Sequence, residues 1–132
     1  MFVDASALVA ILTREPEAQA LVGRLQASAA PITSPVAVYE AVLAIRRKRQ
    51  TRVENVHAEV RKLLIEVGIS LVPITPEDTD RALTAHARYS KGTGHPAGLN
   101  MGDCFAYAVA QGRGVGLLFK GADFARTDLG GA

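Results

Sequence analysis

The chain alternates short apolar runs with longer segments whose apolar residues recur at helical spacing. Four short runs end at polar residues, as buried strands do, and they predict strands at residues 1–3, 31–34, 69–74 and 115–119. The longer segments predict helices at residues 5–12, 18–29, 35 to about 47, 53–67, 76 to about 89 and 100 to about 112.

Residues at the ends of these segments support the predicted boundaries. Ser34 is a good N-cap followed by a proline, Thr75 and Asp78 have the spacing of a capping box, and Gly68 ends the helix before it. Strands that alternate with helices indicate a parallel sheet with helices on both faces. We therefore expect one α/β domain over residues 1–132, with a central, mostly parallel sheet of four to five strands.

Four carboxylates stand at element ends or on apolar helix faces: Asp4, Glu40, Asp103 and Asp123. The first and last of them follow predicted strands, and the other two lie near the starts of predicted helices. Ligand sites of parallel sheets lie outside the carboxyl ends of the strands, so the four acids can converge there. Each also has a plainer explanation, because a first-turn aspartate can simply cap a helix and a glutamate can be paired within the core.

Converging acids need compensation for their charge. At about 4 Å and an effective dielectric constant of about 20, two carboxylates repel by about 4 kcal/mol, so their pKa values rise or a cation sits among them. Oxygen ligands favour Mg²⁺ or Mn²⁺, and the three histidines lack the spacing of a metal site. Carboxylate-held Mg²⁺ serves phosphate chemistry in many α/β domains, which points to a nuclease.

Charge and composition add a possible substrate contact and a compartment. The net charge of +2 is too small to indicate a nucleic-acid binder, but five basic residues crowd into one short segment. They are Arg46, Arg47, Lys48, Arg49 and Arg52, and they could hold an RNA backbone or be a solvated helix end. Cys104 is the single cysteine, which excludes an internal disulfide and suits a reducing cytoplasm. We find neither an export signal nor an apolar run long enough for a membrane, so a cytoplasmic location is expected.

At these residues the chain resembles the PIN-domain ribonucleases, and in particular the VapC-type toxins of VapBC toxin–antitoxin pairs. The matching stretches appear in family order along nearly the whole chain: Val3-Asp4-Ala5-Ser6-Ala7, Glu40 six residues after Ser34, Asn100-Met101-Gly102-Asp103, and Phe119-Lys120-Gly121-Ala122-Asp123-Phe124. The final strand usual in the family looks short or absent, because the chain ends with the residues 128–132.

The resemblance implies a PIN-like domain and an endoribonuclease that depends on Mg²⁺ or Mn²⁺. Asp4 and Asp103 would be the most direct metal ligands, Glu40 would bind metal or position the attacking water, and Asp123 would complete a second metal position. Ser6 and Asn100 would be supporting polar groups. The resemblance also implies an RNA substrate, a homodimer and a small VapB-like antitoxin.

Two other classes of function remain open. One is a different Mg²⁺-dependent phosphate hydrolase, such as a phosphatase with an aspartate nucleophile, but those carry Asp-x-Asp at the first strand and this chain has Ser6 there. The other is an inert PIN-like module that acts through its partner alone, and the intact set of acids counts against it. Cys104, beside Asp103 in an apolar helix, is expected to be a packing residue.

Overall fold

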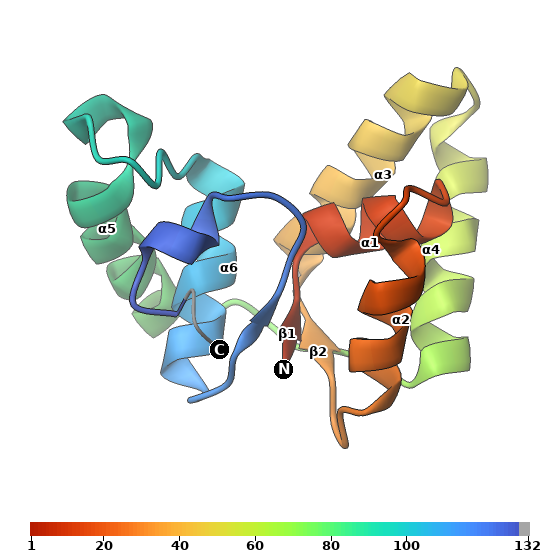
Figure 1. The fold of residues 1–132 in the computed structure, drawn as a ribbon, viewed down its shortest axis with the longest axis horizontal. Coiled ribbons are helices and arrows are strands. Elements are labelled where there is room, and N and C mark those ends of the chain that lie inside the picture. Colours follow the sequence, from red (N-terminus) through yellow and green to blue (C-terminus); the bar gives the residue numbers. More distant parts are fainter. Residues whose placement is uncertain (130–132) are drawn as a thin grey trace.

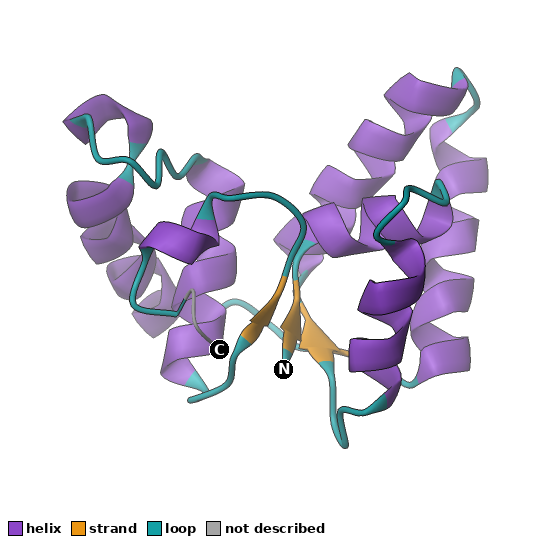
Figure 2. Ribbon diagram, viewed as in Figure 1, coloured by secondary structure: helices purple, strands orange, loops and turns teal. Residues whose placement is uncertain are grey.

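The computed structural model describes residues 1–129 and shows a parallel sheet between two groups of helices (Figure 1). All three strand pairs are parallel, and the strand order is β3-β2-β1-β4. The strands are short: β1 (Phe2–Val3), β2 (Ile32–Thr33), β3 (Ser70–Leu71) and β4 (Leu117–Leu118). Figure 2 shows how small the sheet is beside the helices that surround it.

The helices divide between the two faces of the sheet (Figure 1). One group consists of α1 (Ala5–Leu12), α2 (Ala18–Gln26), α3 (Pro35–Arg49) and α4 (Val53–Val67). The other consists of α5 (Pro76–Tyr89) and α6 (Met101–Gly112), with the 3₁₀ turns Lys91–Thr93 and Phe124–Arg126. None of the helices within residues 1–129 is long and apolar enough to cross a membrane.

Neighbouring residues of the central strands bury their side chains on opposite faces of the sheet. Phe2 and Leu117 join the apolar cluster under α5 and α6, whereas Val3 and Leu118 join the cluster under α1 to α4. All four side chains are almost completely buried. This alternation is the two-residue period of a strand, and it gives the domain two cores separated by one sheet.

The expected α/β class, the parallel sheet with four strands and all six helices are confirmed. The bounds predicted for two strands are wrong, since β3 and β4 are shorter at both ends than the runs 69–74 and 115–119. At their starts, the first residue of each run bonds to the preceding helix. Ile69 N donates to the Leu64 carbonyl and Val115 N to the Ala110 carbonyl, at 2.8 and 3.0 Å. The helix predicted to residue 29 ends at Gln26, since the chain turns there to enter β2.

The local boundary signals hold. The Ser34 side chain caps α3, Thr75 and Asp78 form the capping box of α5, and Gly68 ends α4 with a φ of 79°. Residues 128 and 129 are not in a strand. We expected the domain to extend to residue 132 and the final strand to be short or absent at residues 128–132. Of these, residues 130–132 lie outside the described residues.

Candidate active site

The site lies where the strand order changes direction. β1 is flanked by β2, the next strand along the chain, and by β4, the last one. Connections from β1 and β4 therefore leave toward opposite sides of the sheet, and the crevice between them is the usual binding position of such folds. Asp4 follows β1 directly, and its backbone N–H donates to the Leu118 carbonyl at 2.9 Å. Asp123 follows β4 after a short loop and begins the turn Phe124–Arg126.

Asp4 is buried and is held from one side by a serine. Its Oδ2 accepts hydrogen bonds from the Ser6 backbone N–H at 3.0 Å and from Ser6 Oγ at 2.6 Å. Ser6 Oγ in turn accepts a hydrogen bond from Lys120 N at 2.9 Å, so Ser6 links the segments that follow β1 and β4. Burial raises the pKa of Asp4, the bonds from Ser6 oppose that rise, and the charge of Asp123 adds to it. Asp4 thus caps α1 and also faces the other acids.

Glu40 reaches the same place from α3, through a space that a glycine leaves open. A Cβ added to Gly102 would lie 2.0 Å from Glu40 Oε2, so the carboxylate occupies the volume of the missing side chain. Gly102 thus permits the close approach of the Glu40 carboxylate. Burial raises the pKa of Glu40 to about 7, and the nearby charge of Asp4 adds to the rise.

Asp103 is fixed at the start of α6 by a capping box. Asn100 Oδ1 accepts from Asp103 N at 2.9 Å, and Asp103 Oδ2 accepts from Asn100 N at 3.1 Å. Burial raises the pKa of Asp103 to about 7. The bond from Asn100 opposes the rise, whereas the charge of Asp4, a side-chain hydrogen bond with Asp123 and the charge of Asp123 add to it.

The structure therefore brings the four predicted acids together from four separate segments. The charge of Asp4 raises the pKa values of Glu40 and Asp103, and the charge of Asp123 raises those of Asp4 and Asp103, so the four acids lie close enough to interact. Within residues 1–129, however, no three His, Cys, Asp or Glu side chains are arranged as a ready-made metal-binding group. The donor atoms are all carboxylate oxygens, and in the part of the chain that the structure describes none of the four acids forms an ion pair with a basic side chain, so the residues fit a hard divalent cation in chemistry. Cys104 is buried beside Asp103, as expected of a packing residue.

The five basic residues between positions 46 and 52 are divided among separate places on the surface. Arg47 and Lys48 line a groove of about 680 Å³ between α1 and α3, which Ser6 and Glu40 also line. Arg49 pairs with Glu59 at 2.5 Å and Arg52 with Glu54 at 3.1 Å. Arg46 borders a separate hollow at the far end of α3.

Sequence reasoning assigned no role to two further residues that line this groove, Glu15 and Lys120. Lys120 could have been found, because it follows the last strand and lies three residues before Asp123. Glu15 carried no such signal, since it lies in an ordinary turn between two predicted helices.

A parallel sheet with four acids at its change of strand order is the arrangement that the resemblance to PIN domains implies, and comparison with known proteins shows the family. The PIN domain family model matches residues 1–129. A VapC ribonuclease of Rhizobium meliloti (strain 1021) is 43% identical over 98% of this chain and 99% of its own length. A VapC ribonuclease of Mycolicibacterium smegmatis is 40% identical over 98% and 97%.

The fold has a solved counterpart as well. The crystal structure of the Mycobacterium tuberculosis toxin VapC20, described as cleaving the sarcin–ricin loop, superimposes with a TM-score of 0.74 at 15% identity. The match covers 97% of this chain and 95% of that one. The chain belongs to the PIN-domain family, among its VapC-type ribonuclease toxins.

Proposed function

We propose that this protein is an endoribonuclease that requires Mg²⁺ or Mn²⁺ and cleaves phosphodiester bonds of RNA as the toxin of a type II toxin–antitoxin pair. The observation that carries the proposal is the meeting of Asp4, Glu40, Asp103 and Asp123 at one edge of a PIN-domain sheet. The names of the full-length relatives support it, because they are VapC ribonucleases.

The same four residues would hold the ion, with Asp4 and Asp103 as its most direct ligands. The bound ion would supply stabilisation of the negative charge that develops on the phosphate. The four donors are all carboxylates, which supports a divalent ion. Burial and, to a smaller extent, the charges of neighbouring acids raise the pKa values of Glu40 and Asp103, and a bound cation would relieve the repulsive part of that rise.

The chain's own groups have separate tasks. Glu40, with a pKa of about 7, is partly ionised at neutral pH and can take a proton from the attacking water. Ser6 fixes Oδ2 of Asp4, and the backbone N–H of Asn100 fixes Oδ2 of Asp103, so that each carboxylate keeps one orientation. Such positioning lowers the entropy cost of reaching the reactive geometry.

The test is the substitution Asp4→Asn, which removes one charge and keeps the shape. Asparagine also caps helices well, so α1 should remain folded while RNA cleavage is lost. Cleavage of RNA with Mg²⁺ or Mn²⁺ and thermal melting are measured on the same preparations. Asp80→Asn, on the exposed surface of α5, makes the same change away from the site and should keep full activity. Undiminished cleavage by folded, nuclease-free Asp4→Asn protein would refute the proposal.

Two partners belong to the proposal. A small VapB-like antitoxin would inhibit the toxin by placing a basic side chain against the acids, none of which forms an ion pair within residues 1–129. A homodimer is supported by the apolar residues Leu83 and Met101, which are 63% and 68% exposed beside the hollow between α5 and α6. Co-purification with the product of an adjacent short gene and light scattering of the isolated toxin test these two partners.

One observation counts against each of the two alternative functions, the phosphate hydrolase and the inert module. Ser6, at the position where a phosphatase would have its second aspartate, is bonded to Asp4 and to Lys120 N. An inert module would have no need of four acids held together against their repulsion. Metal-dependent RNA cleavage by the wild-type protein would exclude the inert module.

A further inference from the structure

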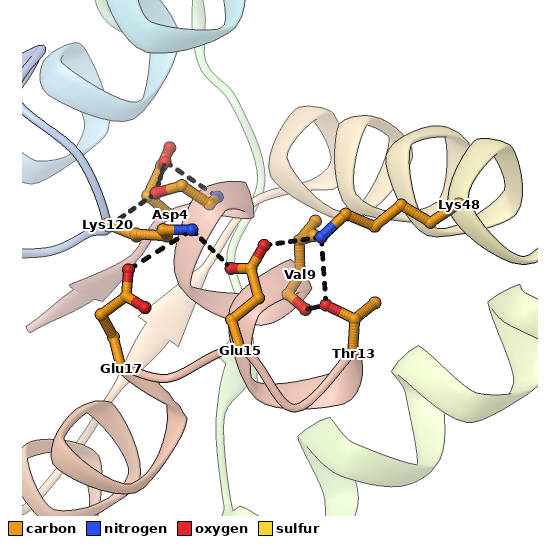
Figure 3. A network of polar contacts seen from close by, with 8 residues as sticks. Asp4, Val9, Thr13, Glu15, Glu17, Lys48 and Lys120 are labelled. Atoms are coloured by element: carbon orange, nitrogen blue, oxygen red, sulfur yellow. Dashed lines mark hydrogen bonds and ion pairs between the residues drawn. The ribbon is translucent and has the colours of Figure 1, made fainter.

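Beside the acids, two lysines are held by one glutamate (Figure 3). Glu15 Oε1 accepts from Lys48 Nζ at 2.6 Å and Glu15 Oε2 from Lys120 Nζ at 3.0 Å. Lys120 Nζ also lies 3.3 Å from Glu17 Oε2. The two lysines hold the pKa of Glu15 below its ordinary value, so this carboxylate stays ionised.

The network opens into the groove that leads to the proposed active site. Glu15, Lys48 and Lys120 line this groove together with Arg47, and its wall continues to Ser6 and Glu40. The backbone of Lys120 is two hydrogen bonds away from the Asp4 carboxylate, through Ser6 Oγ. A polymer that lies along this groove, with one of its bonds at the four acids, would therefore pass the ammonium groups of Lys48 and Lys120.

Glu15 resembles the ligand that such a pair of lysines would bind. A carboxylate and a phosphodiester both carry one negative charge shared between two oxygens, and here each oxygen takes one lysine. The Lys48 and Lys120 side chains are 47% and 36% exposed, and ion pairs between such solvent-exposed side chains add little to stability. An incoming phosphate can therefore replace Glu15 without disrupting the fold.

We propose that Lys48 and Lys120 form a subsite for a backbone phosphate of the RNA strand, next to the bond that is cut, and that Glu15 is the resident anion this phosphate displaces. The inference rests on the proposed function, because it takes RNA as the occupant of the groove. It assigns opposite effects to the two kinds of residue. The lysines promote RNA binding, whereas Glu15 competes with the RNA.

The experiment measures binding of a labelled single-stranded oligoribonucleotide in the Asp4→Asn background, in which the RNA should stay intact. Lys120→Met and Lys48→Met should each weaken binding about tenfold. Each should also reduce the slope of log K against log salt concentration by about 0.7, the value for one lost phosphate contact of a single strand. Glu15→Gln should strengthen binding about threefold, since it frees both lysines. Lys120→Met keeps the backbone N–H that holds Ser6.

The matched controls are Lys62→Met and Glu66→Gln, which alter an exposed ion pair on α4 and should leave binding unchanged. A purely structural network predicts that all three groove variants lose affinity, so weaker binding by Glu15→Gln overturns the proposal. Unchanged affinity and salt slope in both lysine variants also overturn it. An acidic peptide serves as a second binding probe. If the lysine variants lose affinity for this peptide and keep their affinity for RNA, the subsite belongs to a protein partner and the proposal is also overturned.

Wild-type cleavage separates this inference from the proposed function. If the wild type cleaves RNA and the lysine variants bind it normally, the phosphate subsite alone is wrong. If the wild type does not cleave RNA and the Asp4→Asn parent does not bind it, both proposals fail.

Discussion

At the scale of single residues, Gly102 determines where the Glu40 carboxylate can lie. We predict that Gly102→Ala reduces RNA cleavage at least about tenfold and leaves the protein folded. The added Cβ would lie 2.0 Å from Glu40 Oε2, which is the far end of a flexible side chain and can move away. Alanine also favours a helix over glycine by up to about 1 kcal/mol, so stability should not fall. Steady-state cleavage and thermal melting check both parts.

Gly23→Ala in α2 is the control for this substitution. No atom lies within 4 Å of a Cβ added at Gly23, so the change should raise stability and keep activity. Full activity of Gly102→Ala would show that the position of Glu40 is unimportant.

The identity of the four acids could be predicted from the sequence, and their neighbours could not. Asp4 and Asp123 can be selected as candidates because each follows an apolar run, and Asp103 because Asn100 marks a helix start. That Glu40 rests on Gly102 depends on how α3 packs against α6, which no local pattern contains. The bonds of Glu15 to two lysines depend in the same way on how the turn after α1 meets α3 and the segment after β4.

Among the elements, α6 has the start on which the site depends most directly. We predict that Asn100→Ala costs about 1 kcal/mol of stability, because Asp103 N loses the side-chain acceptor of the cap. RNA cleavage by the folded variant should largely persist, because alanine keeps the backbone N–H that holds the Asp103 carboxylate. Asn100→Ser keeps an N-cap acceptor and should lie within a few tenths of a kcal/mol of the wild type. Chemical denaturation provides the comparison, and an alanine variant as stable as the serine variant would contradict the prediction.

Helices and strands differ in how far their own sequence determines them. The starts of α3, α5 and α6 follow from Ser34, Thr75 and Asn100, whose side chains bond within three residues. The residues at which β3 and β4 start do not follow from the local sequence. Ile69 and Val115 are apolar and suited to a strand, but their N–H groups bond to the helices before them. The pairing of a strand is set by partners distant in the chain, so its length is a tertiary property.

In the whole molecule, the acids come from both sides of the sheet. Asp4 and Glu40 belong to the half with α1 and α3, whereas Asp103 and Asp123 belong to the half with α6 and the C-terminal segment. The parallel sheet and its switch point could be predicted from the alternation of strands and helices, because connection rules leave few arrangements. Repulsion among these acids acts between the two halves of the fold.

The burial of these carboxyls, to which their repulsion adds, predicts how stability depends on pH without metal. The pKa values of Glu40 and Asp103 rise from ordinary values of 4.5 and 3.8 to about 7 in the folded protein. Between the ordinary pKa values and about 7, the folded state binds more protons than the unfolded state. The contribution of the protonated Glu40 and Asp103 carboxyls to stability is therefore lost as pH rises through about 7. Melting in EDTA should show a decline across this range, and Glu40→Gln should reduce it. A decline of equal size in Glu40→Gln would assign the effect to other groups.

A divalent ion should reverse this loss. An ion present at about a hundred times its Kd for the folded state adds about 2.7 kcal/mol, which raises the Tm of a domain of this size by roughly 10 °C. We predict that Mg²⁺ or Mn²⁺ produces such a shift and that the shift grows as pH rises through about 7, because protonated carboxyls do not bind the ion. Asp4→Asn should lose most of the shift, whereas Asp80→Asn should keep it. Equal shifts in the wild type and in Asp4→Asn would mean that the ion binds elsewhere, and the four acids would then need another counter-charge.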